Sequence, residues 1–233
     1  MIMQGTGILL FYRPPEIEAQ HKVLSGNNVS DQLVWDHLLK QTLAITSRTS
    51  YPTILYNAER QTGNSFAEKI SNAIAEAFDS GFDNLIVLGT DCPSLRTQQI
   101  NKAADLLHAG KDVVIGPDKR GGVYLLGVNK RAFCKESFLK FHWQTQYLLA
   151  DIKRSAQSFT YELLHSRLQD INSLKDAIIT ASCFYAKASW RNIVFNNLFV
   201  SNNFFQRVFP LIKSSLSSSS LSLRAPPDVV MAF

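Results

Sequence analysis

An aspartate follows a short apolar run in the segment 81–97, which reads GFDNLIVLGTDCPSLRT. The run Leu85–Leu88 is typical of a buried strand, and Asp91 comes shortly after it, with Thr90 before it and Pro93 behind it. In open α/β sheets ligands bind outside the carboxyl ends of the strands, where a carboxylate is a suitable ligand for Mg²⁺ or Mn²⁺. We therefore predict that Asp91 holds a metal ion and that the hydroxyl of Thr90 lies beside it in a cleft. The alternative is that the aspartate forms a turn or caps a following helix.

A glycine pair lies in a second informative segment, 113–127, which reads VVIGPDKRGGVYLLG. Gly121 and Gly122 allow the backbone to come close to a ligand or to adopt a positive φ. Lys119 and Arg120 directly precede them and are suited to contact phosphate or carboxylate groups. The alternative is a glycine hairpin between two core strands, with its basic side chains in solvent.

Polar side chains are concentrated in the segment 168–176, which reads LQDINSLKD. Asp170, Asn172 and Asp176 offer oxygen atoms to a ligand or a metal ion. The alternative is a loop that leads into a helix, with Asn172 or Ser173 as the N-cap residue.

The elements that position these residues are indicated by the pattern of apolar residues. Continuous apolar runs alternate with stretches of helical periodicity, as in strands that are covered on both faces of a parallel sheet. The predicted strands are 6–12, 51–56, 85–88, 112–116 and 123–128, and the predicted helices are 30–44, 64–78 and 97–108. The pattern therefore predicts an α/β domain with a mostly parallel central sheet.

The charged residues are unevenly distributed along the 233 residues. The net charge is +5, but residues 181–233 hold five basic residues and one acidic residue, so residues 1–180 are close to neutral. The absence of a basic stripe from the first part argues against nucleic-acid binding. The segment 213–223, KSSLSSSSLSL, is of low complexity. We predict a folded domain over 1–180 and a Ser-rich, partly disordered appendage over 181–233.

The compartment is indicated by the cysteines and by the absence of long apolar runs. Cys92, Cys134 and Cys183 have no spacing typical of a metal site or a disulfide framework. The first residues lack the features of a signal peptide, and no uninterrupted apolar run reaches the length of about 18 residues that a membrane span needs. These features predict a cytoplasmic protein without a membrane span, and they leave its oligomeric state open.

Four motifs occur in a characteristic order: GTDCPSL, GPDKRGGVYLLG, FHWQT and LQDINSLKD. Together they resemble, over residues 6–178, a bacterial family of largely uncharacterised proteins assigned to the glycosyltransferases. That family is related to the nucleotide-diphospho-sugar transferases of the GT-A fold, and more distantly to molybdenum-cofactor and phospholactate guanylyltransferases. The segment 61–73, QTGNSFAEKISNA, resembles the start of a helix in this family. The resemblance implies a three-layer α/β/α sandwich.

The resemblance also implies roles for residues of this sequence. Asp91 matches an aspartate that holds the metal ion of a nucleotide diphosphate. The positions that match the family's donor and acceptor cleft are Gly121, Gly122, Trp143, Thr145, Asp170 and Asn172, with Asp176 in the same late acidic segment. Trp143 has core packing as an alternative, and the neighbouring His142 is more typical of a structural role.

The sequence departs from the family at three places. The family has a Gly-rich basic segment resembling KxPxPGxxKTRL after its first strand, where this chain has RPPEIEAQHKVL, so only Arg13 and Lys22 could contact phosphates there. Arg120 stands where the family often has an aspartate before the glycine pair. Asp118 is then the remaining candidate for a general base. The late DxD-like element has become Asp-Ile-Asn.

The sequence and the resemblance predict a metal-dependent glycosyltransferase that uses Mg²⁺ or Mn²⁺. Its ligands would be a nucleotide or nucleotide-sugar and a small-molecule acceptor, with phosphate contacts from Arg13, Lys22 and Arg120. One alternative is a guanylyltransferase-like nucleotidyltransferase that acts on a small phosphorylated acceptor. The other is a binding protein that keeps the scaffold without catalysis. Fold alone does not decide among these functions.

Overall fold

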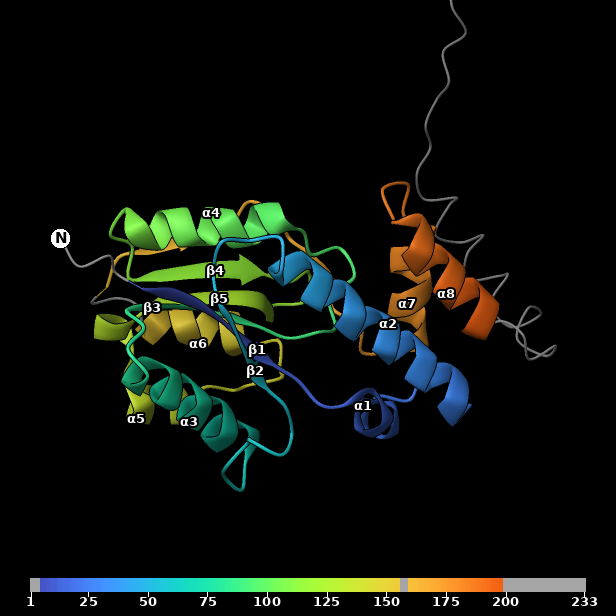
Figure 1. The fold of residues 1–233 in the computed structure, drawn as a ribbon, viewed down its shortest axis with the longest axis horizontal. Coiled ribbons are helices and arrows are strands. Elements are labelled where there is room, and N and C mark those ends of the chain that lie inside the picture. Colours follow the sequence, from blue (N-terminus) through green and yellow to red (C-terminus); the bar gives the residue numbers. More distant parts are fainter. Residues whose placement is uncertain (1–4, 156–158, 199–233) are drawn as a thin grey trace, which may run out of the picture. The chain divides into compact units, whose positions relative to one another are not determined.

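A computed structural model describes residues 5–155 and 159–198 of the chain (Figure 1). The chain divides into two compact units, 1–198 and 199–233, and the second unit lies outside the described residues. Among the described residues, no helix has the length and apolar character that a membrane crossing requires.

The centre of the first unit is a six-stranded sheet with the order β2-β1-β3-β5-β4-β6. Its strands are β1 (Thr6–Phe11), β2 (Thr53–Tyr56), β3 (Asn84–Leu88), β4 (Val113–Pro117), β5 (Val123–Asn129) and β6 (Tyr161–Leu163). Strand β5 runs antiparallel to both β3 and β4, whereas the other neighbouring strands pair in parallel. The predicted mostly parallel sheet is confirmed, and its one reversed strand follows from the tight connection between β4 and β5.

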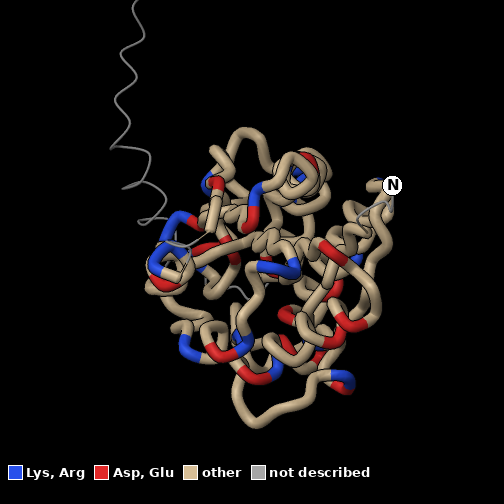
Figure 2. The backbone as a smooth tube through the Cα atoms, turned by 90° about the vertical axis from the view of Figure 1, so that its left-hand side faces the viewer, with Lys and Arg blue, Asp and Glu red and all other residues tan. Residues whose placement is uncertain are grey.

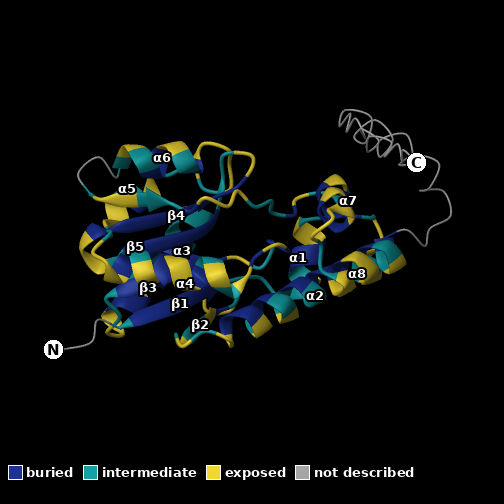
Figure 3. Ribbon diagram, turned by 90° about the horizontal axis from the view of Figure 1, so that it is seen from above, coloured by how far each residue is buried: buried dark blue, intermediate teal, exposed yellow. Residues whose placement is uncertain are grey.

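Helices cover both faces of this sheet (Figure 1). One face packs on α4 (Thr97–His108) and on part of α2 (Asn28–Thr46), and the other packs on α3 (Phe66–Asp79), α5 (Lys135–Leu139) and α6 (Leu148–Ser155). Strands β1, β3, β4 and β5 are almost wholly buried, whereas the edge strands β2 and β6 are partly exposed. The helices have a buried and an exposed side (Figure 3). The predicted three-layer α/β/α sandwich is therefore confirmed.

A smaller group of helices lies beyond the carboxyl ends of the strands. It comprises α1 (Pro15–His21), the first half of α2, α7 (Leu174–Ser182) and α8 (Ala188–Leu198). Trp190 anchors α8, since its ring is buried and its indole N–H donates to Oγ1 of Thr180 at 3.1 Å. Helix α8 belongs to the segment 181–233 that the sequence predicts to be an appendage. The boundary at residue 180 and the Ser-rich segment 213–223 stay predictions, and the latter lies outside the described residues.

The charged positions do not separate by sign over the part of the chain that the structure describes. Figure 2 shows basic and acidic positions interspersed along the backbone. This distribution agrees with the near-neutral first 180 residues of the sequence.

Candidate active site

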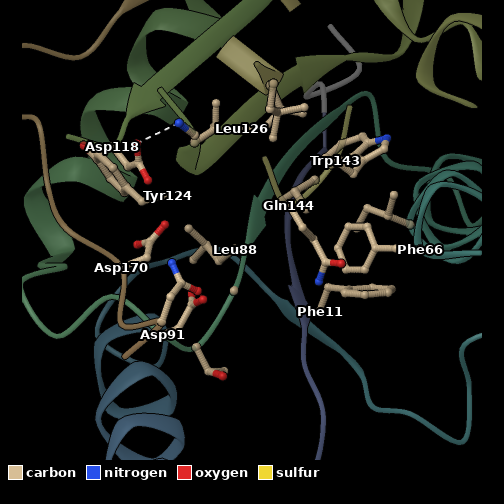
Figure 4. Close-up of a pocket in the computed structure, with 18 of the residues that line it drawn as sticks. Phe11, Phe66, Leu88, Asp91, Asp118, Tyr124, Leu126, Trp143, Gln144 and Asp170 are labelled. Carbon is tan, nitrogen blue, oxygen red and sulfur yellow. Dashed lines mark hydrogen bonds between the residues drawn. The ribbon is translucent and has the colours of Figure 1, made fainter. Parts of the chain in front are cut away.

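A cleft of about 460 Å³ opens at the carboxyl ends of β1 and β3, beside the turn that leads into β5. Its two ends differ in chemistry. In Figure 4 the polar end presents Asp91, Asp118, Asp170 and Tyr124, the other end presents Phe11, Phe66, Trp143 and Gln144, and Leu88 and Leu126 lie between them. The size falls within the range of small-molecule sites. The cleft therefore suits a ligand that is charged at one end and flat or apolar at the other.

Asp91 is held by a lysine from the first helical segment. The ammonium of Lys22 lies 2.6 Å from Oδ2 of Asp91 and 3.4 Å from Oε1 of Glu18. Burial lowers the pKa of Lys22, but the two carboxylates outweigh it, so the net shift of the pKa is upward. Glu18 also pairs with Arg13 at 3.0 Å. The structure thus brings two predicted phosphate-binding residues to the predicted metal ligand, through a glutamate that sequence reasoning missed.

The alternatives for Asp91 are that it forms a turn or that its side chain caps the next helix, and the capping alternative is not confirmed. Instead, Arg96 is the N-cap residue of α4, and its backbone N–H donates to the side chain of Gln99 at 3.0 Å. The carboxylate of Asp91 faces the cleft and Lys22. Helix capping therefore does not explain why an aspartate stands at this position.

The carboxylate of Asp170 has an oxygen without a hydrogen-bond partner and a raised pKa. Its Oδ1 is buried and has no hydrogen-bond partner among the described residues. Burial, together with the negative charges of Asp91 and Asp118, raises the pKa of Asp170 to about 8, against the opposing effects of Cys92 and Lys22. The buried hydroxyl of Tyr124 likewise lacks a partner within the described chain. A perturbed acid beside unsatisfied polar atoms in a cleft is typical of a functional site.

Asp118 and the glycine pair build the turn between β4 and β5. Oδ1 of Asp118 accepts hydrogen bonds from the backbone N–H groups of Arg120 at 2.6 Å and of Gly122 at 2.7 Å. Gly121 has a φ of +93°, and a Cβ there would lie 2.3 Å from the carbonyl oxygen of Gln146. The hairpin of the alternative is thus confirmed, but its basic side chains are not both free in solvent, because Arg120 pairs with Asp176. Asp118 and Gly122 also line the cleft, which leaves Oδ2 of Asp118 as the oxygen that could act on a ligand.

Arg120 is engaged in an ion pair rather than directed freely into the cleft. Its guanidinium donates to both carboxylate oxygens of Asp176, at 3.0 and 3.1 Å, and to the carbonyl oxygen of Asp170 at 2.9 Å. Ser173 is the N-cap residue of α7, as the capping alternative predicts, because its Oγ accepts from the backbone N–H of Asp176 at 3.3 Å. The hydroxyl of Ser173 also donates to the carboxylate of Asp176 at 2.9 Å. The pKa of Asp176 is lowered, because its hydrogen bonds outweigh the effect of burial. Asn172 is exposed and lines the cleft.

The aromatic end contains the predicted Trp-x-Thr motif. The indole N–H of Trp143 donates to the carbonyl oxygen of Phe138 at 2.7 Å, and its ring packs against Phe66 at a centroid distance of 5.9 Å. The hydroxyl of Thr145 donates to the carbonyl oxygen of His142 at 2.8 Å. Both polar groups stabilise their own loop. Trp143 combines partial core packing with a position on the wall of the cleft.

The carboxylates of the polar end decide whether it fits a divalent cation. Among residues 5–155 and 159–198, no group of three or more His, Cys, Asp or Glu side chains is arranged to hold a metal ion. Mg²⁺, however, is commonly bound through one or two carboxylates together with phosphate oxygens and water. Asp91 and Asp170 meet this smaller requirement, and the unpartnered Oδ1 of Asp170 is an available oxygen ligand. The residues present therefore fit a cation that arrives with a phosphate ligand.

The fold resembles solved structures of transferases. A provisionally assigned nucleotide-diphospho-sugar transferase from Desulfovibrio desulfuricans G20 matches with a TM-score of 0.64 and 20% identity, over 91% of this chain and 98% of that one. This match confirms the predicted GT-A-like fold. Two further structures have lower TM-scores. A cytidylyltransferase from Leptospira borgpetersenii matches at 0.46 and 10% identity, over 96% of this chain and 100% of that one. The protein Rv0371c of Mycobacterium tuberculosis H37Rv, solved in complex with manganese, matches at 0.43 and 11% identity, over 76% and 97%.

Sequence comparison gives the family but not a characterised relative. No protein of curated function matches the chain significantly. Residues 21–145 match the profile of DUF2064, a family described as uncharacterised proteins conserved in bacteria. The matched segment spans more than half of the chain and contains Asp91, the glycine pair and the Trp-x-Thr motif. The chain therefore belongs to the DUF2064 family.

Proposed function

We propose that this protein is a metal-assisted glycosyltransferase, which binds a nucleotide-diphospho-sugar in the cleft and transfers the sugar to a small acceptor. The observation that supports this most directly is the charge state of the polar end. Asp170 keeps an unpartnered oxygen and a pKa of about 8, because burial and the negative charges of Asp91 and Asp118 outweigh the positive charge of Lys22. A cation bound with a diphosphate supplies further positive charge.

Asp91 and Asp170 are the residues that would hold the metal ion. When bound, Mg²⁺ or Mn²⁺ supplies electrostatic stabilisation of the charge on the leaving diphosphate. Both carboxylates line the same cleft, and Lys22 already fixes the orientation of Asp91 through a contact of 2.6 Å. Substitution of either Asp91 or Asp170 therefore tests the proposed requirement for a metal ion.

Arg13 and Lys22 are the residues that we assign to the phosphates. Both are half-buried in the cleft wall, and both are oriented by the buried carboxylate of Glu18. Charge-assisted hydrogen bonds from such preoriented cations stabilise negative charge on a leaving diphosphate. Arg120 is less suitable because its guanidinium is already bound by Asp176.

Asp118 is our candidate for the base that accepts a proton from the acceptor hydroxyl. Its Oδ1 is used by the turn, so the proton would go to Oδ2. Thr90 and Trp143 form parts of the cleft wall where the sugar and acceptor would lie. A positioned base of this kind typically contributes about 10²–10⁴-fold to the rate.

The segment after β1 supports sugar transfer over nucleotidyl transfer. Nucleotidyltransferases of this fold wrap a triphosphate with the backbone N–H groups of a Gly-rich loop. Here helix α1 begins at Pro15, and no glycine occurs between Arg13 and Lys22. Two side-chain cations are therefore the phosphate-binding groups of this segment.

The experiment is thermal unfolding of the wild type, Asp91→Asn and Asp170→Asn with a panel of ligands. The panel contains UDP-, GDP-, CDP-, ADP- and dTDP-sugars and the nucleoside triphosphates, each with and without Mg²⁺ or Mn²⁺. A ligand at about 100 times its Kd stabilises the fold by about 2.7 kcal/mol. Asp105→Asn is the matched control, since Asp105 is an exposed residue of α4 outside the cleft.

Metal-dependent stabilisation by one nucleotide-sugar, lost in both cleft variants and kept in the control, is the expected result. Turnover of that donor with release of the nucleoside diphosphate would then identify the reaction. Stabilisation by a triphosphate alone would replace the proposal with nucleotidyl transfer. No stabilisation by any member of the panel would overturn both and favour a binding protein on this scaffold.

A further inference from the structure

Gln144 has a backbone conformation that glutamine rarely adopts. Its φ is +60°, and no other non-glycine residue among those described has a positive φ. Left-handed backbone is unfavourable for residues with a Cβ, and it persists where the surrounding structure determines it. Such residues are concentrated at ligand sites, so Gln144 requires an explanation from its surroundings.

The residues on either side of Gln144 are fixed by hydrogen bonds. The backbone N–H of Trp143 donates to the carbonyl oxygen of Phe141 at 2.9 Å, and the indole donates to Phe138. The hydroxyl of Thr145 donates to the carbonyl oxygen of His142. These contacts hold the loop on both sides and account for the retention of a strained residue between them.

The side chain of Gln144 extends into the aromatic end of the cleft. In Figure 4 its carboxamide lies beside the ring of Phe11, close to that of Phe66. Gln144 is exposed, and within the described chain its carboxamide makes no hydrogen bond, although a carboxamide offers an acceptor and two donors in one plane. A polar group placed against aromatic rings with its hydrogen-bonding capacity free is suited to a ligand.

The aromatic rings form a continuous wall. Phe11 and Phe66 contact each other edge to face at 5.5 Å, and Phe66 contacts Trp143 at 5.9 Å. All three side chains are half-buried and line the cleft. Exposed faces of such rings favour stacking with another planar ring.

We propose that Gln144 determines specificity by hydrogen-bonding the edge of a planar heterocycle that stacks on the ring of Phe11. On the proposed function, on which this inference rests, the heterocycle is the base of the nucleotide. A carboxamide matches an edge with neighbouring donor and acceptor atoms, as adenine presents to glutamine elsewhere. The strained backbone is kept because it directs the carboxamide to that edge.

The test compares binding of UDP, CDP, GDP, ADP, dTDP and inorganic pyrophosphate by calorimetry in the presence of Mg²⁺. The variants are Gln144→Ala, Gln144→Glu and Gln144→Gly, with Gln98→Ala on α4 as the matched control. We expect the wild type to prefer one base at least tenfold and Gln144→Ala to reduce this preference to about threefold or less. Gln144→Glu, which loses the amide donor, should change the order of preference. Affinity for pyrophosphate should be the same in all variants.

Gln144→Gly separates a ligand-binding role from a structural one. Glycine adopts a positive φ without strain. We therefore expect the variant to unfold at a higher temperature than the wild type and to lose base discrimination. A purely structural role predicts a lower midpoint of thermal unfolding and unchanged discrimination among bases, and this result would overturn the inference.

The remaining outcomes are also decisive. Unchanged base preference in Gln144→Ala, or a wild type that does not discriminate among bases, would overturn the inference and leave the proposed function standing. A wild type that binds pyrophosphate but none of the nucleoside diphosphates would likewise overturn the inference that the cleft recognises a base. Failure of the wild type to bind any of the probes would overturn the proposed function as well.

Discussion

The ammonium of Lys22 lies 2.6 Å from Oδ2 of Asp91, although the two residues are 69 positions apart in the sequence. This contact joins the segment after β1 to the end of β3 at the polar end of the cleft. Glu18 of helix α1 also contacts the lysine, with its Oε1 at 3.4 Å from the ammonium of Lys22, the C-cap residue of that helix. The residue that we assign to phosphate binding thus also compensates the proposed metal ligand when no ligand is bound.

Lys22→Met should destabilise the fold by about 1–3 kcal/mol, because hydrogen bonds that involve charged groups contribute amounts of this order. The substitution leaves the carboxylates of Asp91 and Glu18 without their cation. Urea denaturation measures the effect. In a double-mutant cycle, Lys22→Met combined with Asp91→Asn should destabilise the fold by less than the sum of the two single changes, since the second change removes one of the unpaired charges.

Lys40→Met is the matched control for this prediction. Lys40 pairs with Asp36 at the same distance of 2.6 Å, but its side chain is 74% exposed, against 19% for Lys22. Exposed pairs contribute about 0–1 kcal/mol. Equal losses in the free energy of unfolding of the two lysine variants would show that the contact between Lys22 and Asp91 contributes no more than an exposed ion pair.

Asp170→Asn should stabilise the ligand-free protein more at high pH than at low pH. The pKa of Asp170 is raised to about 8, so the fold holds a proton that the unfolded chain releases near pH 4. Stability is therefore lost as the pH rises toward 8, and asparagine avoids this loss because it resembles the neutral acid. We expect a gain in Tm at pH 8.5 of about 2–4 °C, which corresponds to about 1 kcal/mol in a chain of this length.

The measurement is thermal unfolding at pH 5, 6.5 and 8.5 without metal. The gain should shrink steadily toward pH 5, and the exposed-site variant Asp105→Asn should show no such trend. A gain that is independent of pH would contradict the raised pKa of Asp170. If Asp170→Asn also loses metal-dependent ligand binding, the carboxylate of Asp170 lowers the stability of the fold but is needed for binding.

Much of the fold could be predicted because its core strands are continuous apolar runs. Strand β6 could not, since Tyr161–Leu163 is short and Tyr161 is exposed. Helix α1 was missed because Pro15 signals the end of a strand as readily as the first turn of a helix. Helix α8 depends on the burial of Trp190 against other helices, which is a tertiary contact.

The candidate site was predictable only where chain position carries chemical meaning. Asp91 could be singled out because it follows a buried strand. Glu18 could not, because its importance lies in contacts with Arg13 and Lys22 and not in any motif. The positive φ of Gln144 likewise depends on the loop around it. The N-cap of α7 could be predicted, by contrast, because Asn172 and Ser173 are both typical N-cap residues, and Ser173 takes this position.

Arg120→Met should destabilise the protein by about 1–3 kcal/mol at neutral pH, because it leaves the buried carboxylate of Asp176 without its cationic partner. The pKa of Asp176 is lowered in the fold, so the stability that it contributes is present above the pKa of the unfolded chain. The difference between the variant and the wild type should therefore shrink as the pH falls below about 4. Urea denaturation at pH 7 and pH 3.5 measures this trend.

Arg120→Lys is the informative companion variant. Lysine keeps the charge but has one nitrogen in place of the two that donate to Asp176 and to the carbonyl oxygen of Asp170, so it should restore only part of the lost stability. Hydrogen exchange should also become faster in the turn 118–122, because Arg120 connects this turn to α7. Full rescue by lysine would show that charge alone is required.

Gly121→Ala should be strongly destabilising, by about 3 kcal/mol or more, and should disrupt the cleft. Two effects combine, because the φ of +93° disfavours a side chain and the new Cβ would lie 2.3 Å from the backbone oxygen of Gln146. That oxygen belongs to the loop that carries Gln144, so relief of the clash must move this loop. Gly26→Ala isolates the first effect, since Gly26 has a φ of +82° and a Cβ at that position would meet no atom within 4 Å. We expect a loss of about 1–2 kcal/mol there. Urea denaturation of both variants gives the difference, and equal losses would show that the approach of Gly121 to Gln146 does not constrain the site.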